Sequence, residues 1–349
     1  MEVQTEQPDG NALTTTRAIR DALAGESTEQ LVPIWLDPMV VNSSNAIGYS
    51  GAQVVTDSTG TKYVTETIAV DPRPRNHSQL SKDVEKLARV LRESKDVPGV
   101  LTCKGVIRGQ ETDGAPEKFE FIYEMPPALD NAPKCLRTVL LKSPQEPHPL
   151  EERVLLAKQV AKAVMFVHNL NFVHKNMRPE TILVFPNPGK TLGIPFIVGF
   201  QMFRAADGSS YMAGDESWSK NLYRHPSRQG NYPDNKYKMQ HDIYSLGVIL
   251  LEIGLWTPLV GQMGEPGVEF SQIVPLLQDR DQRRKAARIK KELVTMAYNH
   301  LPPRMGTKYS EVVVSCLMCL ERDPESGSES EYPDDDGTLI LNMLEEIDV

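Results

Sequence analysis

The character of this 349-residue chain changes near Pro127, and the change constrains its fold more than any other feature. Between Pro33 and Pro126, Gly and Asn separate apolar runs that are typical of β-strands: AQVV, KYVTETIAV, GVLTCKGVI and KFEFIYEM. One helix interrupts these runs, because apolar residues recur there at helical spacing, at Leu80, Val84, Leu87 and Leu91. After Pro127 the pattern predicts long helices over residues 151–168, 242–255, 282–300 and 308–320. The sequence therefore predicts an α+β protein with a small β-rich lobe and a larger helical lobe.

The same composition shifts divide the chain into four expected segments. Residues 1–30 are polar and rich in Thr, Glu and Asn, which predicts a flexible arm. Residues 31–126 form the small N-lobe, and residues 127–325 form the helical C-lobe. Residues 326–349 form an acidic C-terminal tail that contains SGSESEYPDDDG.

Composition narrows the classes of function. Lys and Arg number 38 against 47 Asp and Glu, a net charge of −9 that does not favour nucleic acid as a partner. The sequence contains no run of about 18 apolar residues, so it predicts no transmembrane segment. The N-terminus lacks the pattern of a signal peptide. Four cysteines are too few for a disulfide framework. We therefore expect a cytoplasmic protein.

One segment of the helical lobe carries a dense motif. FVHKNMRPETILV, residues 172–184, follows the long helix predicted over residues 151–168. It resembles the catalytic loop of protein kinases, in which the pattern is H-R-D-L-K-P-E-N-I-L. Five positions match in order: His174, Pro179, Glu180, Ile182 and Leu183.

Further segments resemble kinase motifs in the family's order. LYRHPS at 222–227 is similar to the Y-R-x-P-E that closes the activation segment, and CLERDP at 319–324 is similar to the start of the last family block. HDIYSLGVILLEIG is similar to the D-x-W-S-x-G segment, with matches at Asp242, Ser245 and Gly247. The resemblance covers roughly residues 44–324 and implies a two-lobed protein-kinase-like fold.

The residues that carry phosphoryl transfer in the family are replaced in this chain. Asn176 stands where the proton-accepting Asp belongs, and an amide has no useful basicity near neutral pH. Thr181 stands at the position of the magnesium-binding Asn, and Gly199, without a side chain, at that of the D-F-G Asp. Asp71 aligns with the strand lysine that orients the phosphates, so its charge would repel them. The resemblance therefore implies no catalytic residue and no metal ligand.

The nucleotide-binding positions are also altered. Gly48 and Gly51 in AIGYSGAQVV have the spacing of the last two glycines of G-x-G-x-x-G, which fits a degraded phosphate lid or an ordinary β-turn. Glu124 lies where the family has its hinge, and the bulky Tyr123 before it would narrow an adenine slot. We expect Glu85, the candidate for the helix glutamate, to be exposed, because no lysine pairs with it. No cofactor is expected, and binding of ATP without magnesium is left open.

The retained motif residues have structural roles in this interpretation. His174 is a core histidine that supports the loop, Asp242 accepts hydrogen bonds from backbone N–H groups of the loop, and Pro179 shapes its hairpin. Gly247 belongs to the retained helix motif. The family's ion pair between the Glu of A-P-E and an Arg has lost both partners, because Ser227 and Gly327 stand there; loss of one partner alone would strand a buried charge.

Two other sequence patterns favour a structural interpretation over a functional one. Cys316 and Cys319 form C-x-x-C inside an apolar run with no second Cys or His pair, which favours a buried helix face over a zinc site. The basic stretch DRDQRRKAARIKKEL is typical of a solvated helix face, and docking to an acidic partner, a membrane surface or RNA is the alternative.

Three segments also resemble the sequences of kinase-like domains of filamentous fungi: VHKNMRPETIL, FIVGF and the segment around LYRHPS. Those domains are often attached to a HeLo-type prion-inhibition and propagation domain, in signalling linked to cell death and self-recognition. The resemblance implies a pseudokinase, a non-catalytic signalling, scaffold or allosteric module whose partner is a HeLo-domain protein or a related kinase-like protein. The alternative is an atypical ATP-dependent protein kinase that uses displaced carboxylates, such as Glu180 or Asp207.

Overall fold

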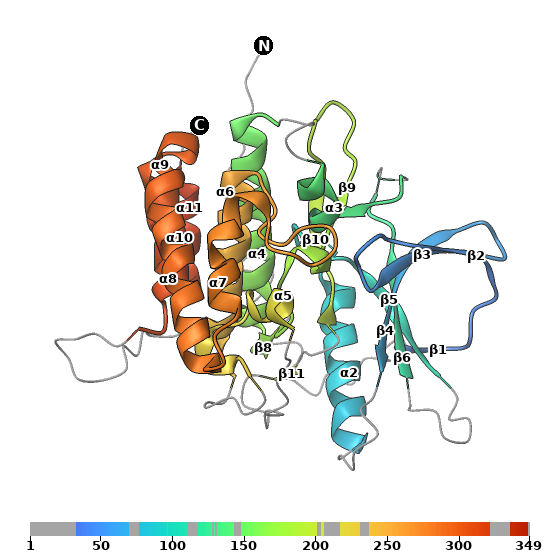
Figure 1. Cartoon of the computed structure of the whole chain (residues 1–349). Helices are drawn as coiled ribbons and strands as arrows, with labels where there is room; N and C mark the ends of the chain where they lie inside the picture. The colour runs from blue at the N-terminus through green and yellow to red at the C-terminus, as the bar shows by residue number, and fades with distance from the viewer. Residues whose placement is uncertain are drawn as a thin grey trace. The chain divides into compact units, whose positions relative to one another are not determined.

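The computed structural model divides the chain into two compact units. It describes residues 33–69, 77–95, 97–109, 118–127, 129, 131–142, 148–200, 204–205, 217–230, 237–321 and 336–347. The first unit comprises residues 1–45 and 52–130, and the second comprises residues 46–51 and 131–349. The first is rich in strands and the second is mainly helical (Figure 1), which confirms the predicted α+β class with a small sheet lobe and a larger helical lobe.

The first unit is built on a six-stranded sheet in the order β1-β5-β6-β4-β3-β2. Its strands are β1 (Trp35–Leu36), β2 (Val41–Ala46), β3 (Ala52–Asp57), β4 (Lys62–Ala69), β5 (Cys103–Arg108) and β6 (Lys118–Glu124). β1 pairs in parallel with β5, whereas the pairs β5–β6, β6–β4 and β4–β3 are antiparallel. The four apolar runs of the sequence therefore become β3 to β6.

One helix, α2 (His77–Glu93), packs against β5 of this sheet. Its apolar residues lie three or four positions apart, so they share one face. Val84, Leu87 and Leu91 are buried on that face, with at most 1% of each side chain exposed. The amphipathic pattern thus becomes the helix that covers the small sheet.

The second unit contains the long helices that the sequence predicts. They are α4 (Leu150–Asn169), α6 (Met239–Leu255), α8 (Gln282–His300) and α10 (Thr307–Met318). Shorter helices include α3 (Leu136–Leu141), α5 (Trp218–Asn221), α7 (Val274–Leu277), α9 (Pro302–Met305) and α11 (Asp336–Glu345). Two small sheets lie in this unit, β10-β9-β7 and β11-β8. Their strands are β7 (Lys134–Cys135), β8 (Phe172–Val173), β9 (Ile182–Phe185), β10 (Ile194–Ile197) and β11 (Arg204–Ala205).

The centre of the helical unit is α6, which is buried from His241 to Leu255. A helix that is apolar nearly all round belongs in the interior. It contacts α4 and α10, and a β-carbon on Gly247 would lie 2.7 Å from the Cβ atom of Cys316 on α10. The glycine at this motif position therefore lets the two helices approach closely.

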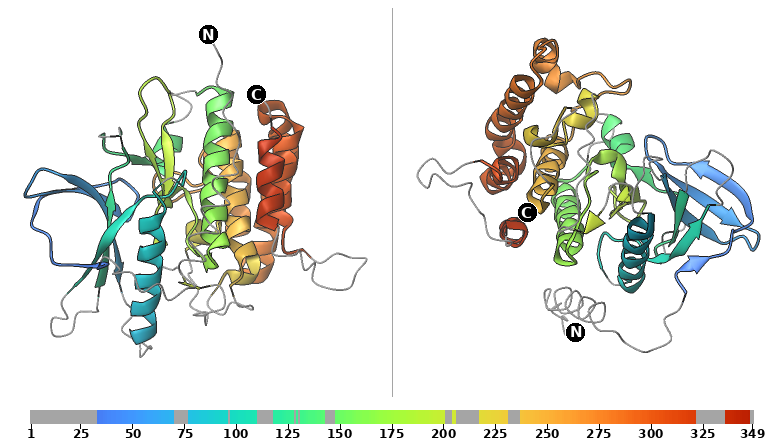
Figure 2. Two further views of the ribbon diagram at one scale, coloured as in Figure 1. Left: turned by 180° about the vertical axis from the view of Figure 1, so that it is seen from behind. Right: turned by 90° about the horizontal axis from the view of Figure 1, so that it is seen from below.

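The C-terminal segment contains a helix as well as acidic residues. α11 covers Asp336–Glu345, and Figure 2 shows it beside α4 and α10. Ile340 and Leu344 are buried there, while Lys162 of α4 lies 3.1 Å from the carboxylate of Glu345. Residues 1–32 and 322–335 lie outside the described residues, and with them the expected arm and part of the expected tail.

The four cysteines are buried thiols that form no disulfide. Cys316 lies on the buried face of α10, and the Cys319 thiol donates a hydrogen bond to the carbonyl of Gln240 at 3.3 Å. Among the described residues, no helix combines the length and the apolar character needed to span a membrane.

Candidate functional site

Asp242, in the first turn of α6, holds the loop that resembles the kinase catalytic loop. Its carboxylate accepts hydrogen bonds from the backbone N–H groups of His174 (2.8 Å) and Lys175 (2.9 Å). The Tyr237 hydroxyl donates to it at 2.6 Å, and Nε2 of His168 lies 3.1 Å away. Burial alone would raise the pKa of Asp242, but the hydrogen bond and charge of His168, with the other donors, lower it to about 2. Asp242 is therefore a buried carboxylate that ties the loop to the central helix.

His174 is a neutral core side chain. Its Nε2 lies 2.9 Å from the carbonyl oxygen of Val198, and its Nδ1 accepts the N–H of Asn176 at 3.3 Å. These partners place the imidazole proton on Nε2. The ring lies 4.7 Å from the ring of Phe200, and burial lowers the pKa of His174 to about 4. The imidazole thus links the catalytic-loop-like turn to the strand end that precedes Gly199.

Pro179 is buried and begins a 3-10 turn, Pro179–Thr181, that leads into β9. In this turn the Thr181 hydroxyl donates to the carbonyls of Arg178 (2.9 Å) and Asn176 (3.2 Å). The backbone N–H of Arg178 in turn donates to the same hydroxyl oxygen at 3.2 Å. The side chain at the family's metal-binding position therefore serves the backbone of its own loop.

Asn176, Thr181 and Gly199 lie in contact with one another. The Asn176 amide donates to the carbonyl oxygen of Gly199 at 3.3 Å. A β-carbon built on Gly199 would lie 2.3 Å from Cγ2 of Thr181 and 2.7 Å from its Cβ, and Gly199 has a φ of +92°. The space in which a side chain of residue 199 would begin is therefore filled by Thr181, so any larger residue at position 199 would have to displace Thr181.

These three positions do not fit the magnesium ions that kinases use. Magnesium prefers carboxylate oxygens, phosphates and water in an octahedral arrangement. Here Gly199 supplies no side chain, and the Thr181 hydroxyl is already hydrogen-bonded to two carbonyls. Within the described residues, no group of three or more His, Cys, Asp or Glu side chains is arranged to hold a metal ion. Asp71 lies outside the described residues.

The glycines expected at a phosphate lid lie in a β-turn. The N–H of Ser50 donates to the carbonyl of Ile47 at 3.0 Å, between strands β2 and β3. Gly48 and Gly51 are exposed, and the Gly48 carbonyl accepts hydrogen bonds from the thiol of Cys135 (3.0 Å) and the hydroxyl of Thr138 (3.3 Å). The turn thus directs a carbonyl oxygen of Gly48, an acceptor, toward those side chains.

The expected hinge residues lie at the end of β6. Glu124 is exposed, and its N–H donates to the carbonyl of Thr102 at 2.9 Å. Tyr123 is buried against Phe121, with ring centroids 6.0 Å apart, and burial raises its pKa. On α2, Glu85 forms an ion pair with Arg89 one turn further on, and 37% of its side chain is exposed.

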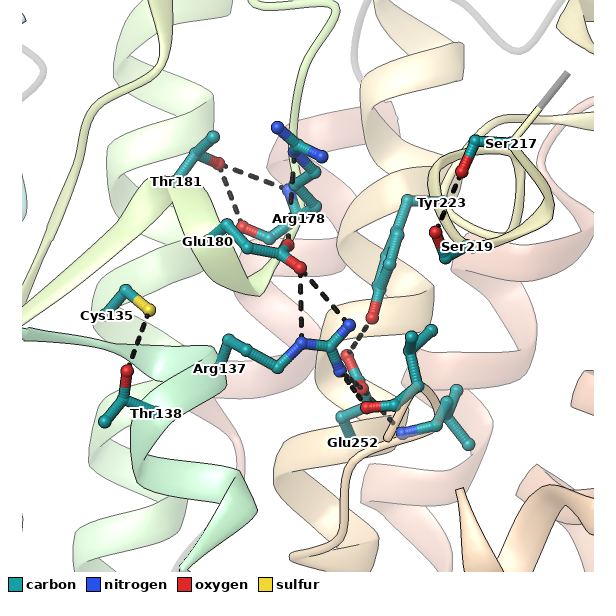
Figure 3. A network of polar contacts seen from close by, with 12 residues as sticks. Cys135, Arg137, Thr138, Arg178, Glu180, Thr181, Ser217, Ser219, Tyr223 and Glu252 are labelled. Carbon is teal, nitrogen blue, oxygen red and sulfur yellow. Dashed lines mark hydrogen bonds and ion pairs between the residues drawn. The ribbon is translucent and has the colours of Figure 1, made fainter. Parts of the chain in front are cut away.

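Glu180 belongs to a buried ion network that the sequence did not predict. Figure 3 shows the Arg137 guanidinium between the carboxylates of Glu180 and Glu252. Its Nε donates to Glu180 at 3.2 Å, and its Nη1 lies 3.8 Å from Glu252. Glu252 also accepts the Tyr223 hydroxyl (2.9 Å) and the N–H of Leu259 (2.8 Å). Burial raises the pKa of Glu252 to about 7, although Arg137 opposes the shift.

A second cluster surrounds Ser227, the residue at the position of the family's A-P-E glutamate. Its hydroxyl lies 2.9 Å from Nδ1 of His225 and 3.3 Å from Nε2 of His241. Nζ of the buried Lys290 lies 3.4 Å from Nε2 of His225 and pairs with Glu321. Neutral hydrogen bonds therefore stand where the family has a carboxylate, while Gly327 lies outside the described residues.

The sheet lobe, the helical lobe and the loop held by Asp242 define the class of a kinase-fold protein. Residues 57–301 match the family model of protein tyrosine and serine/threonine kinases, so the chain belongs to that family. It is also 29% identical over 121 residues to the dual specificity protein kinase lkh1 of Schizosaccharomyces pombe. That match covers 31% of this chain and 16% of the relative.

Proposed function

We propose that this protein is a pseudokinase, a kinase fold that transfers no phosphate and acts as a non-catalytic signalling, scaffold or allosteric module. The observation that carries the proposal is the contact between Thr181 and Gly199, where one side chain fills the space of the other residue's missing side chain. A single mutation at Gly199 cannot introduce a metal-binding carboxylate there without displacing Thr181.

The chemistry of phosphoryl transfer supports the same proposal. Catalysis in kinases consists mainly of positioning and of neutralising charge with magnesium. The Asn176 amide cannot accept the proton of a substrate hydroxyl, and it donates to the Gly199 carbonyl instead. Loss of a general base alone commonly costs about 100-fold or more in rate. Loss of the base and of both metal ligands together would leave little transfer.

The rival proposal is an atypical ATP-dependent phosphotransferase, and the similarity to a named dual specificity kinase favours it. It requires a displaced carboxylate. Glu180 is the described candidate, but its carboxylate is paired with Arg137 and its side chain is only 14% exposed. Asp207, the other candidate, lies outside the described residues.

A protein partner is part of the proposal. The sequence resemblance to fungal kinase-like domains supports a partner that carries a HeLo-type domain or a related kinase-like domain. Copurification of the full chain with such a protein tests this part. A monomer that captures neither kind of protein would contradict it and would leave the pseudokinase assignment untouched.

Thermal unfolding with ATP, in magnesium or in EDTA, tests the pseudokinase assignment. A ligand at 100 times its dissociation constant stabilises a protein by about 2.7 kcal/mol, so binding is visible as a rise in Tm. We expect no magnesium-dependent rise and no phosphate transfer to a generic protein substrate. A rise that is equal in EDTA would indicate a nucleotide-gated pseudokinase.

Kinase activity itself provides the outcome that would overturn the proposal. Magnesium-dependent phosphate transfer that is lost in Glu180→Gln or in Asp207→Asn would establish the phosphotransferase. Glu151→Gln, an exposed carboxylate at the start of α4, is the matched control and should leave any transfer unchanged. Transfer that survives all three substitutions would point to a contaminating kinase, which mass spectrometry of the preparation identifies.

A further inference from the structure

The helical unit contains a cavity of about 740 Å³ away from the catalytic-loop-like turn. It lies among the end of α3, the start of α4, the end of α6 and the segment that joins α6 to α7, which is the orange loop in Figure 1. Ligand pockets in proteins commonly measure about 300–1,000 Å³, so the cavity has the size of a small-molecule site. The residues that matter to its chemistry are Leu141, His148, Arg153, Trp256, Val268 and Arg304.

Arg153 brings an uncompensated positive charge to this cavity. Its Nη1 donates to the carbonyl of Gly254 at 3.2 Å, whereas its buried Nε has no partner among the described residues. No carboxylate in the described part of the chain pairs with Arg153. Burial lowers the pKa of Arg153, and the nearby guanidinium of Arg304 lowers it further. An anion bound here would relieve both unfavourable effects.

The other charged groups of the cavity are already engaged. Arg304 pairs with Glu269 at 3.0 Å and donates to the carbonyl of Leu255 at 3.3 Å. The Glu265 carboxylate accepts the N–H of Met263 at 2.8 Å within its own loop. His148 lies edge-on to the ring of Trp256, with centroids 5.0 Å apart. Arg153 is therefore the group best placed to receive an anionic ligand.

The cavity also offers apolar surface. Leu141, Leu255 and Trp256 line it, and Val268 lies at its exposed edge with 91% of its surface accessible. Trp256 ends α6 in the left-handed conformation, at a φ of +54°, and this places its backbone at the turn into the cavity-lining loop. A ligand with an apolar body and one acidic group would complement both parts of the lining.

We propose that this cavity binds an organic carboxylate, with its acidic group on the Arg153 guanidinium and its apolar body against Trp256 and Leu141. A guanidinium matches a carboxylate in geometry and charge. The carboxylate has two sources, a free organic acid or the C-terminus of a polypeptide. The proposal is independent of whether the protein transfers phosphate.

Fluorescence of Trp256 measures binding directly. The chain has three tryptophans, so the Trp35→Phe/Trp218→Phe background leaves Trp256 as the reporter. The probes are 4-phenylbutyrate, its uncharged amide, and a peptide ending in Phe with either a free or an amidated C-terminus. We expect saturable binding of the free acid or of the free-ended peptide, and at least tenfold weaker binding of the amides, because a charge-assisted hydrogen bond is lost.

Two variants make the test specific to the cavity. Arg153→Met should weaken binding at least tenfold, whereas Arg280→Met, an exposed arginine outside the cavity, should leave it unchanged. Val268→Phe changes an exposed residue without adding a tryptophan and should block binding with the same Tm, so a folding defect of Arg153→Met does not decide the result. Binding of the free acid alone assigns a small acid, and binding of the peptide alone assigns a polypeptide terminus.

Three results would overturn the proposal. The first is an amide that binds as tightly as its acid. The second is binding that survives in both Arg153→Met and Val268→Phe. The third is the absence of a signal from every probe at millimolar concentration.

Discussion

Cγ2 of Thr181 lies 2.3 Å from the point at which a β-carbon on Gly199 would stand. This contact joins two positions that the kinase family uses for metal ligands, and a side chain at position 199 would require Thr181 to move. Restoring the family's aspartate at position 199 alone would therefore produce a clash with Thr181 before it produced a binding site.

Gly199→Ala should destabilise the protein strongly. Overpacking costs about 1–3 kcal/mol, and the positive φ adds about 1 kcal/mol for a residue with a β-carbon. Gly189→Ala is the matched control, because Gly189 has a φ of +82° but nothing within 4 Å of its β-carbon position. Urea unfolding compares the two variants. Equal destabilisation would mean that backbone strain, and not the contact with Thr181, decides the cost.

A double-mutant cycle separates the energy of the contact between residues 181 and 199 from the backbone strain at residue 199. Thr181→Ser removes Cγ2 and keeps the hydroxyl that donates to two carbonyls. Combined with Gly199→Ala, it should give a coupling energy of about 0.5–3 kcal/mol, so the double variant is more stable than the sum of the single effects predicts. Strict additivity would contradict the proposed contact.

Asp242→Asn should cost about 3 kcal/mol or more at neutral pH, since a buried charge with several donors is replaced by a group that accepts fewer hydrogen bonds. The pKa of Asp242 is about 2 in the folded protein and about 3.9 when unfolded. Its stabilisation is therefore complete above pH 4 and lost as the pH falls toward 2. Unfolding at several pH values should show the difference between variant and parent shrinking over this window.

The exposed Asp37 supplies the control for Asp242. Asp37→Asn should leave unfolding nearly unchanged across the same pH range. A difference between the Asp242 variant and the parent that is constant from pH 5 to pH 2 would show that the carboxylate charge does not hold the loop.

The buried histidines should make the stability of the folded protein depend on pH in a second way. Burial lowers the pKa of His225 to about 3, with help from Lys290 and His241, and lowers that of His241 to about 4. Unfolded histidine binds a proton near pH 6.5, so each residue should reduce stability as the pH falls from 6.5 to 4, by about 1.4 kcal/mol per pH unit. His225→Gln should remove the contribution of one histidine, so the free energy of unfolding should fall less steeply as the pH is lowered. The exposed His300 provides His300→Gln as the control, and the same flattening there would refute the assignment.

The sequence predicted most of the fold because its signals are local. α8 begins as expected at Gln282, since the Asp281 side chain caps its first turn by accepting the N–H groups of Arg283 and Arg284 at 3.0 Å. α6 begins earlier than expected, at Met239, because His241 accepts the N–H of Lys238 at 2.8 Å. Histidine is not a usual capping signal, so the earlier start could not be predicted.

The candidate site was predictable in its residues and not in its contacts. Motif spacing identified Asn176, Thr181 and Gly199 as three separate replacements of the family's residues. Only the structure shows that these three residues are in contact. Glu252 gave one usable signal, as a single charge inside the apolar run of α6. A buried carboxylate requires a partner, yet nothing in the sequence connects Glu252 to Arg137, far earlier in the chain.

Arg137→Met tests that partnership. The variant should lose about 3–5 kcal/mol at pH 8, because the buried Glu252 carboxylate would lose its cation, whereas Glu180 keeps Arg178 at 4.0 Å. The pKa of Glu252 is already about 7 and should rise further in the variant. The folded carboxyl then binds a proton that the unfolded one releases above pH 4.5, so the loss should be smaller at pH 5 than at pH 8. Arg89→Met removes a half-exposed pair with Glu85 and should cost at most about 1 kcal/mol at either pH. An Arg137 variant equally destabilised at both pH values would mean that Glu252 does not titrate with the network.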